Sequence, residues 1–301
     1  MDSIILYRNG SNVTAPYLDT VFPVYRNGIV ADIASLTTTA TGSISYTFRG
    51  ANGSTFVLDW GHGSPEIVTL LGTGTYVTKS HDYLGTTGTK QITFRQGVLN
   101  ITYLDVPHTT ATGGDLSNLS GMAGLKNLYL HSTAVTGNLL SLSGMTGLIY
   151  LYLYSTAVTG NLSSLSAMTL LAQLYLSSTA VTGNLSSLSA MASLTQLFVN
   201  LTTVTGNLES LASNNLDYIY TYFSGVTYAD GGLRAWGNID ARHYSSGWTS
   251  AMVDNYLIDA NDAGWASCII SIAGTNAART SASAAALAAL VSRGCTVTVN
   301  E

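Results

Sequence analysis

The sequence predicts a modular, mainly β protein with an α/β C-terminal end, and three observations support this fold class. A block of 23 residues recurs in mid-chain, with TAVTGNLSSLSAM beginning at Thr156 and again at Thr179. Alternating β-like runs precede this block, and helix-then-strand patterns follow it. We therefore expect an N-terminal β arm over 1–38, a β-sandwich over 39–103, a solenoid over 104–236 and helix-backed capping repeats over 237–301.

The N-terminal arm contains a short internal repeat. The tetrapeptide YRNG begins at Tyr7 and again at Tyr25, each time after a β-like run. Asn-Gly in this setting is a strong signal for a two-residue hairpin turn. The run TTTATGS that follows has the composition of a linker. Because this segment has no core of its own, we expect it to serve in attachment or oligomerisation.

The next segment carries two motifs, FVLDWGHGS around Trp60 and HDY at His81, followed by the alternating run ITF. They resemble the PKD-like, immunoglobulin-type β-sandwich family, whose pattern is W-D-F-G-D-G-S, then H-x-Y, then a strand. One departure is His62, which stands where the family has the second Asp of its turn. The resemblance implies a spacer or adhesion module. We expect His62 and His81 to be turn and packing residues rather than metal ligands.

The central repeats follow L-x-x-L-x-L at a fixed period, which is the sequence signature of a solenoid. They begin at Leu125, Leu148, Leu171 and Leu194, with a degenerate unit near Leu104. The pattern resembles the leucine-rich repeat family, and most of all its plant-type class. The family has Asn where this chain has Thr133, Thr156, Thr179 and Thr202. A Thr hydroxyl has a single donor, so we expect it to do only part of the work of that Asn.

The leucine pattern of each repeat predicts that the repeat forms one layer of a shared core. Leucines two apart in a strand point to the same side, so one layer contains Leu128, Leu130, Leu139, Leu142, Met145 and Leu148. A buried leucine contributes about 2 kcal/mol, but a single unit cannot bury its apolar face alone, and neighbouring units therefore stack. We expect a turn after each strand, with positive φ or close backbone approach, at Gly137, Gly160, Gly183 and Gly206.

The outward residue between the two strand leucines is aromatic in successive repeats. It is Tyr129, Tyr152, Tyr175, Phe198 and Tyr220, flanked on one side by Tyr150 and Tyr218 and on the other by His131, Tyr154 and Tyr222. Parallel strands lie about 4.8 Å apart, so these rings should form a row along the concave face. Such a row is either a cross-strand ladder that stabilises the sheet or a binding platform on which sugar rings stack. The two interpretations are compatible.

The C-terminal residues predict two helix-backed repeats that cap the solenoid. AMVDNYLIDANDAG from Ala251 and SASAAALAALVSRG indicate helices, whereas CIISIAG and CTVTVN indicate strands. The two cysteines, Cys268 and Cys295, begin these strands, and a bridge between them is left open. The ending GTNAART to CTVTVN resembles the C-terminal ends of leucine-rich-repeat proteins from phages and prophages of Bacteroidetes-like hosts.

Composition excludes several function classes. Only 9% of residues are charged, the net charge is −5, and the 11 Lys and Arg residues form no basic stripe, so we predict no nucleic-acid partner. No apolar run is long enough to span a bilayer. Phosphate loops, Cys/His ligand pairs and nucleophile elbows are absent, and the acids in the repeats (Asp115, Glu209 and Asp217) are isolated. We therefore predict no enzyme, no cofactor and no metal. The acids of the cap, including Asp254, are expected on a solvated face.

These observations together favour a non-catalytic phage virion protein, either a tail fibre or spike or a surface decoration, whose repeats bind a host-surface glycan. The neutral, hydroxyl-rich composition is typical of extracellular and virion β-proteins, and the start MDSIILYRNG lacks the basic region of a secretory leader. We expect the arm to contact other virion proteins, the chain to be a homo-oligomer, and the protein to lie on the virion surface. The alternatives are a structural virion subunit without a ligand and a bacterial surface adhesin, which would be extracellular.

Overall fold

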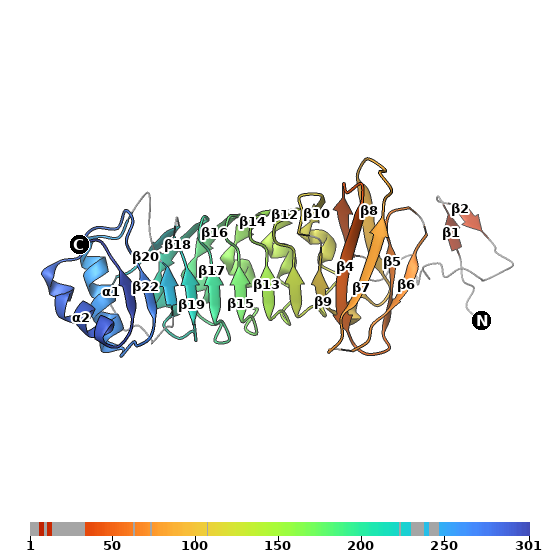
Figure 1. Ribbon diagram of the computed structural model, residues 1–301. Coiled ribbons are helices and arrows are strands. Elements are labelled where there is room, and N and C mark those ends of the chain that lie inside the picture. The colour runs from red at the N-terminus through yellow and green to blue at the C-terminus, as the bar shows by residue number, and fades with distance from the viewer. Residues whose placement is uncertain are drawn as a thin grey trace.

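The computed structural model is an elongated stack of strands with a β-sandwich at one end and two α-helices, α1 (Ser250–Asp262) and α2 (Ala284–Ser292), at the other (Figure 1). The structure describes residues 6–8, 11–13, 34–62, 64–72, 74–106, 108–222, 224–229, 238–240 and 247–301. Two long sheets, of ten and eleven strands, run through the molecule. This arrangement confirms a mainly β fold with helices near the C-terminus.

The sandwich divides its strands between the two long sheets, and its strand pairs are antiparallel. Its core is aromatic: the rings of Phe48 and Phe56 lie 4.8 Å apart, and Phe94 packs against both. The Tyr83 hydroxyl donates to the backbone oxygen of Trp60 at 2.8 Å and joins the two motifs recognised in the sequence. The strands are β3 (Ala34–Thr38), β4 (Ser43–Gly50), β5 (Thr55–Asp59), β6 (Glu66–Thr69), β7 (Val77–Asp82) and β8 (Lys90–Arg95).

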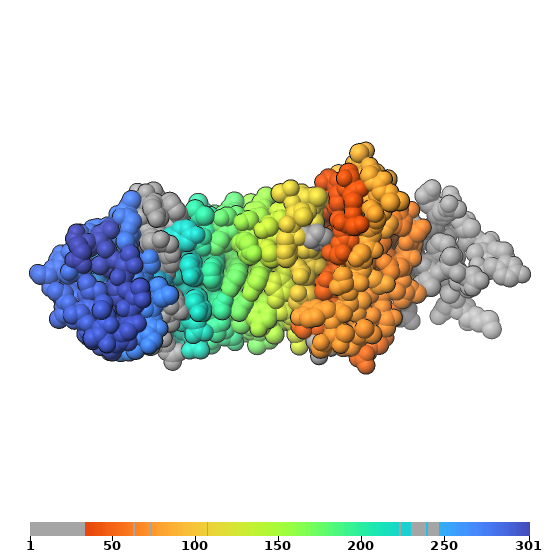
Figure 2. Space-filling view, in the orientation of Figure 1, coloured from red at the N-terminus to blue at the C-terminus, as the bar shows by residue number. Residues whose placement is uncertain are grey.

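One predicted boundary is wrong. The strand β3 was assigned to the arm, but it pairs with β8 along its whole length, and Leu36 is fully buried in the sandwich core. The sandwich also merges with the solenoid, because β3 pairs with β10 (Thr112–Asp115) and β4 pairs with β9 (Ile101–Asp105). In the space-filling view the sandwich passes into the repeats without a gap on the visible face (Figure 2). The two parts therefore share one continuous core.

The described part of the arm is a small antiparallel pair. Strand β1 (Leu6–Arg8) pairs with β2 (Ser11–Val13), with Arg8 opposite Ser11. This pairing agrees with a hairpin at the first YRNG, whose Asn9 and Gly10 lie outside the described residues. The second YRNG, at Tyr25, lies outside them as well. The two-sheet arrangement agrees with a sandwich, and its membership of the PKD-like family stays a prediction.

Each repeat contributes one strand to each sheet and a short 3-10 helix between them. In the eleven-stranded sheet, β9 is followed in parallel by β11 (Asn127–Tyr129), β13 (Tyr150–Tyr152), β15 (Gln173–Tyr175), β17 (Gln196–Phe198), β19 (Tyr218–Tyr220) and β21 (Asn238–Asp240). The ten-stranded sheet continues from β10 with β12 (Ala134–Asn138), β14 (Ala157–Asn161), β16 (Ala180–Asn184), β18 (Thr203–Asn207) and β20 (Gly225–Thr227). The 3-10 helices are η1 (Val98–Asn100), η2 (Leu116–Leu119), η3 (Leu139–Leu142), η4 (Leu162–Leu165), η5 (Leu185–Leu188) and η6 (Leu208–Leu211).

The predicted core is confirmed. The inward leucines and methionines of the repeats are at most 1% exposed, and they stack layer upon layer as expected for a leucine-rich repeat solenoid. The sequence interpretation missed a further inward residue, the valine of each AVTGN strand, which is fully buried at Val135, Val158 and Val181. A second strand in each repeat explains this valine, because its inward side also needs an apolar residue.

The repeat glycines have the predicted positive φ, but they lie inside a strand instead of a turn. Gly160 has φ 113° within β14, and a Cβ there would lie 2.5 Å from Oδ1 of Asn138 in the preceding repeat. That Asn138 oxygen is occupied, because it accepts a hydrogen bond from the Leu140 amide and caps η3. Close approach of neighbouring repeats at this cap therefore requires glycine.

The repeat threonines replace only part of an asparagine ladder. Thr156 Oγ1 donates to the backbone oxygen of Leu153 at 2.5 Å, within its own repeat, and the hydroxyls of Thr133, Thr179 and Thr202 do the same. Along the ladder the neighbouring repeats are joined instead by backbone hydrogen bonds, for example from the Ser155 amide to the Ser177 oxygen at 2.9 Å. A single hydroxyl donor thus satisfies the local turn and leaves the contact between repeats to the backbone.

The C-terminal end closes the solenoid with the predicted helices and strands. Strands β22 (Ile269–Ser271) and β23 (Thr296–Thr298) extend the eleven-stranded sheet in parallel, and a short 3-10 helix, η7 (Ser281–Ser283), precedes α2. Cys268 and Cys295 lie side by side as buried free thiols. In contrast to the expectation, Asp254 is buried (5% exposed), because α1 directs its carboxylate at the turn that begins the second capping repeat.

Candidate ligand-binding face

The outward side of the eleven-stranded sheet carries three columns of side chains, one residue per repeat in each. Equivalent residues of successive repeats are directly paired, as Tyr129 is with Tyr152 and Tyr152 with Tyr175, so the sequence period becomes a straight row. The central column consists of Tyr129, Tyr152, Tyr175, Phe198 and Tyr220. The amide flank consists of Asn127, Tyr150, Gln173, Gln196 and Tyr218, and the open flank of His131, Tyr154, Ser177, Asn200 and Tyr222. The structure thus brings every predicted site residue onto one face.

The rings of the central column contact one another, and two of the neighbouring pairs are stacked. The ring centroids of Tyr152 and Tyr175 are 4.2 Å apart with an interplanar angle of 4°, and Phe198 lies 4.1 Å from Tyr175. The Phe198 ring stacks on Tyr220 at 4.4 Å. Tyr129 instead meets Tyr152 edge to face, at 89°, and Tyr175 and Phe198 are tilted by 43°. In the two stacked pairs the rings cover each other's faces, so these pairs present ring edges to a ligand and leave no room between them for a sugar ring.

Hydroxyl groups of the central column are fixed by the amide flank. Tyr152 donates to Oε1 of Gln173, and Tyr175 donates to Oε1 of Gln196, so each hydroxyl reaches into the next repeat. Burial raises the pKa of Tyr175 and, more strongly, that of Tyr152, so both groups stay protonated donors at neutral pH. This network orders the face before any ligand arrives.

The sequence interpretation missed the extension of this face onto the sandwich. Tyr103 of β9 lies 5.2 Å from Tyr129, and Tyr76 lies 4.9 Å from Tyr103. The Arg49 guanidinium carbon sits 5.0 Å and 5.3 Å from the centres of the Tyr76 and Tyr103 rings. These residues precede the periodic region, so no repeat signal could have identified them.

A histidine pair marks the beginning of the open flank. The rings of His108 and His131 are 3.6 Å apart, and His131 stacks on Tyr154 at 4.3 Å with an angle of 10°. Asp105 holds His108 through a contact of 2.8 Å to Nε2. Burial, and then the neighbouring His108, lowers the pKa of His131 to about 4, so His131 is neutral at physiological pH.

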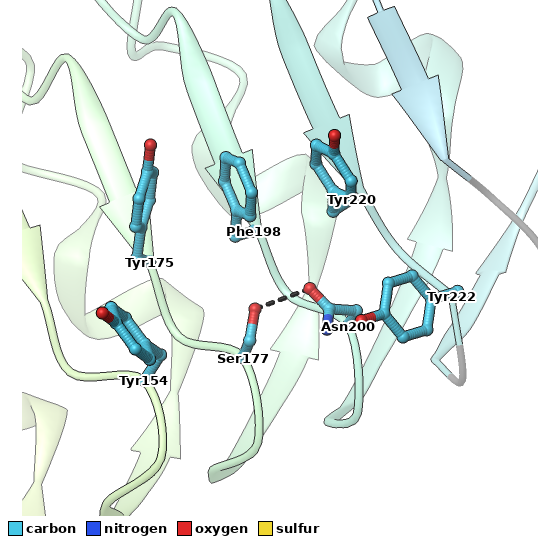
Figure 3. Close-up of a pocket in the computed structure, with 7 residues that line it drawn as sticks. All are labelled: Tyr154, Tyr175, Ser177, Phe198, Asn200, Tyr220 and Tyr222. Atoms are coloured by element: carbon cyan, nitrogen blue, oxygen red, sulfur yellow. Dashed lines mark hydrogen bonds between the residues drawn. The ribbon is translucent and has the colours of Figure 1, made fainter. Parts of the chain in front are cut away.

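The open flank is interrupted by a hollow where two consecutive repeats carry small polar residues (Figure 3). Between the rings of Tyr154 and Tyr222, the flank holds only Ser177 and Asn200. The Ser177 hydroxyl donates to Oδ1 of Asn200 at 2.6 Å. The hollow, which we call the slot, has a volume of about 340 Å³ and is lined by Tyr154, Tyr175, Ser177, Phe198, Asn200, Tyr220 and Tyr222.

Among the residues that the structure describes, no three or more His, Cys, Asp or Glu side chains converge as a metal site would require. Neither α1, with 13 residues, nor α2, with 9, has the length and apolar character to cross a membrane, and this holds for every helix of the described ranges. The chemistry on offer at the face is hydrogen bonding and apolar contact.

The two sheets differ in how far their outward residues vary between repeats. The strand of the ten-stranded sheet reads AVTGN in β12, β14 and β16 alike. In the same three repeats the open flank changes from His131 to Tyr154 to Ser177. The sequence of the ten-stranded sheet is thus identical in these three repeats, whereas the open flank of the eleven-stranded sheet differs in each of them.

Comparison with known proteins gives solved structures only: no family model and no curated protein matches the chain. The functional domain of InlJ from Listeria monocytogenes is similar over 72% of this chain and 42% of its own length, at 16% identity and a TM-score of 0.49. An internalin C2 from Listeria monocytogenes matches 37% of this chain and 48% of its own, at 28% identity and a TM-score of 0.33. The LRR ectodomain of the receptor kinase GASSHO1/SCHENGEN3 from Arabidopsis thaliana, in complex with CASPARIAN STRIP INTEGRITY FACTOR 2, matches 43% of this chain and 18% of its own, at 21% identity and a TM-score of 0.35. This chain therefore spans less than half the length of each of these structures.

Proposed function

We propose that the protein is a non-catalytic phage virion component, a tail fibre, spike or surface decoration, that binds a host-surface glycan through the outward side of its eleven-stranded sheet. One observation carries the binding role. Repeats that share the identical strand AVTGN on one sheet carry different outward residues on the other, at His131, Tyr154 and Ser177. Stacking of the repeats alone imposes no such difference, whereas recognition of an irregular ligand does.

The chemistry of the face favours a glycan. A sugar offers hydroxyl groups and patches of C–H, and the face offers Tyr hydroxyls, carboxamides and aromatic edges side by side. From Asn127 to Tyr222, the three columns of outward residues hold no Asp, Glu, Lys or Arg, and burial lowers the pKa of their one histidine, His131. A carboxylate enters the face only at its sandwich end, where Asp105 of β9 pairs with Tyr129. A neutral, ordered, polar-aromatic surface binds a neutral polar ligand without having to bury an unpaired charge.

The virion assignment rests on sequence. It draws on the resemblance of the C-terminal residues to phage and prophage leucine-rich-repeat proteins, and on a chain with 9% charged residues. In this proposal the N-terminal arm contacts other virion proteins, and a homo-oligomer presents several copies of the face to the host. Several copies would raise the overall affinity well above that of a single face.

The first test of binding is a glycan microarray combined with intact host cells. The purified chain is compared with a Tyr152→Ser/Tyr175→Ser variant, which removes the stacked centre of the column, and with a Thr159→Ser/Thr182→Ser control on the other sheet. The control keeps both hydroxyl donors to Gly137 and Gly160. Circular dichroism must show all three proteins folded. We expect the wild type and the control to bind and the tyrosine variant to lose binding.

A second candidate function has its own support. The stacked rings of the central column stabilise the sheet by about 0.5–1.5 kcal/mol per pair, so a purely structural subunit would also benefit from them. Folded protein that binds neither cells nor glycans would favour this structural role and contradict the binding proposal.

Attachment through the arm is tested separately by deletion. The deletion must end at residue 33, because Leu36 of β3 belongs to the sandwich core and its loss would unfold that part. We expect a chain lacking residues 1–33 to fold and to bind host cells but to be missing from assembled particles. Normal incorporation would refute the role of the arm.

A further inference from the structure

The slot in the open flank has the features of a subsite for a single sugar ring, and this inference rests on the proposed glycan binding. We infer that it holds one uncharged pyranose unit, a hexose or N-acetylhexosamine at a chain end or branch, against the ring of Tyr154 and above Ser177 and Asn200. Four lines of observation support this assignment: exposed ring area, paired hydrogen-bonding groups, charge and size.

The slot is the place where the open flank leaves an aromatic face uncovered. Tyr154 is stacked on one side by His131, at 4.3 Å. Its other side is directed along the row toward Ser177, whose side chain is too short to continue the stack (Figure 3). An aromatic face carries partial negative charge and attracts the weakly positive C–H groups of a sugar ring. The central-column rings that border the slot, Tyr175, Phe198 and Tyr220, have centroids 4.1 Å and 4.4 Å apart, which is too close to admit a sugar ring between them.

The floor of the slot pairs an acceptor with a donor. The Ser177 hydroxyl donates its proton to Oδ1 of Asn200 at 2.6 Å, so the serine oxygen keeps its lone pairs for a ligand. Asn200 is only 5% exposed, and its Nδ2 makes no hydrogen bond to the described part of the chain. An acceptor and a donor in adjacent repeats, just beyond the ends of β15 and β17, match two neighbouring hydroxyl groups of a sugar. The ordering of both groups by their mutual bond reduces the entropy lost on binding.

Charge and size set the class of sugar. Of the described residues that line the slot, none has a carboxylate or a cationic side chain. Burying the carboxylate of a uronic or sialic acid there would leave it without a partner, which is costly. The volume of about 340 Å³ is at the lower end of the roughly 300–1,000 Å³ typical of small-ligand pockets. A single ring with its substituents suits this space, whereas a stretch of several sugars must lie on the open face outside it.

The test uses the full-length protein, a glycan microarray and single-sugar competitors. The competitors are the methyl glycosides of glucose, galactose, mannose and N-acetylglucosamine, compared with those of glucuronic acid and N-acetylneuraminic acid. Two variants address the slot: Asn200→Asp, which keeps the acceptor for Ser177 but removes the donor and adds a charge, and Ser177→Tyr, which fills the slot. The matched control is Asn161→Asp, which adds the same charge on the ten-stranded sheet. The Asn161 oxygen accepts from the Ser163 amide, and Asp115 already makes the same cap contact with the Ser117 amide in an earlier repeat.

We expect array binding to neutral glycans, competition by at least one neutral methyl glycoside and none by the acidic ones. Both slot variants should weaken binding at least tenfold, and Asn161→Asp should not. Thermal unfolding followed by circular dichroism must show each variant folded. This combination of results supports the inference.

Three other outcomes would overturn the inference and leave the proposed binding function standing. They are binding of neutral glycans that both slot variants retain, preferential binding of acidic glycans, and binding of host cells that protease treatment of the cells abolishes. Folded protein that binds no cell, glycan or protein would overturn the proposed function as well as the slot.

Discussion

The substitution Gly160→Ala tests whether contact between repeats at the helix caps limits the stability of the solenoid. Gly160 has φ 113°, and an added Cβ would lie 2.5 Å from Oδ1 of Asn138 and 2.8 Å from the Leu139 amide nitrogen. The neighbour that must move is part of a working cap, because the same Oδ1 accepts from Leu140 N at 2.9 Å. The substitution therefore strains the backbone at residue 160 and also disturbs the Asn138 cap of η3.

The magnitude follows from these two effects. Placing a side chain at such a φ costs about 1–3 kcal/mol, and losing the asparagine cap costs about 1 kcal/mol. The sum, roughly 2–4 kcal/mol, corresponds to a fall in Tm on the order of 10 °C, since chains of this size lose about 2–4 °C per kcal/mol. The assay is thermal unfolding followed by circular dichroism, with urea unfolding as a second measurement.

The chain supplies a matched control in Gly144→Ala. A Cβ at Gly144 would meet nothing within 4 Å, and the next two repeats already carry alanine at that position, Ala167 and Ala190. We expect this control to leave Tm unchanged or to raise it slightly, because alanine restricts the unfolded chain. If Gly160→Ala melts within about 1 °C of the control, the argument from close approach is refuted.

Three further predictions concern single side chains. Thr156→Val should cost about 1–2 kcal/mol in urea unfolding, because it leaves the buried oxygen of Leu153 without its donor; a cost below about 0.3 kcal/mol would count against the hydroxyl's role. His131 is neutral when folded, with a pKa of about 4 against 6.5 for a free side chain, so the unfolded state binds more protons between these values. Stability should therefore fall as pH drops from 6.5 to about 4, and His131→Gln should flatten that part of the Tm profile. Burial by itself would raise the pKa of Asp254, but hydrogen bonds from Ser283 and Thr280 outweigh it and lower the pKa. The carboxylate therefore stabilises the cap above its ordinary pKa, and this gain is lost as pH falls through the lowered pKa. Asp254→Ala should lower Tm at pH 7, and the fall in Tm should become smaller as the pH is lowered.

The repeats were predictable because their information is local. Alternating leucines two apart and a fixed 23-residue period place the strands of the eleven-stranded sheet and their buried side chains, and the structure confirms both. The same period predicted the outward row from Tyr129 to Tyr220. The glycine at position 160 predicted a positive φ. Whether that residue lies in a turn or in a strand depends on its hydrogen bonds with the neighbouring repeat, which the sequence does not give.

The features that escaped prediction depend on contacts between distant segments. Strand β3 joins the sandwich through pairing with β8, more than fifty residues away, and nothing in ASLTT indicates that partner. Tyr103 joins the aromatic face only because β9 continues the sheet into the repeats. The slot is the clearest case, since Ser177 and Asn200 are inconspicuous until the register places them between two aromatic residues.

The substitution Ser177→Tyr, which fills the slot, should affect the stability of the fold and the binding of glycan in opposite directions. The open flank already shows what a ring does there: His131 and Tyr154 stack at 4.3 Å in adjacent repeats of the same scaffold. A tyrosine in place of Ser177 continues that stack, and we expect it to stabilise the fold by about 0.5–1.5 kcal/mol, less the loss of the hydrogen bond to Asn200. A chain selected only for a stable solenoid would gain from this ring, whereas a chain that needs the slot would lose its ligand. Unchanged or higher Tm together with lost glycan binding would show that the gap in the column serves recognition. A large fall in Tm would show instead that Ser177 and Asn200 are needed for the fold, and the functional argument for the slot would then fail.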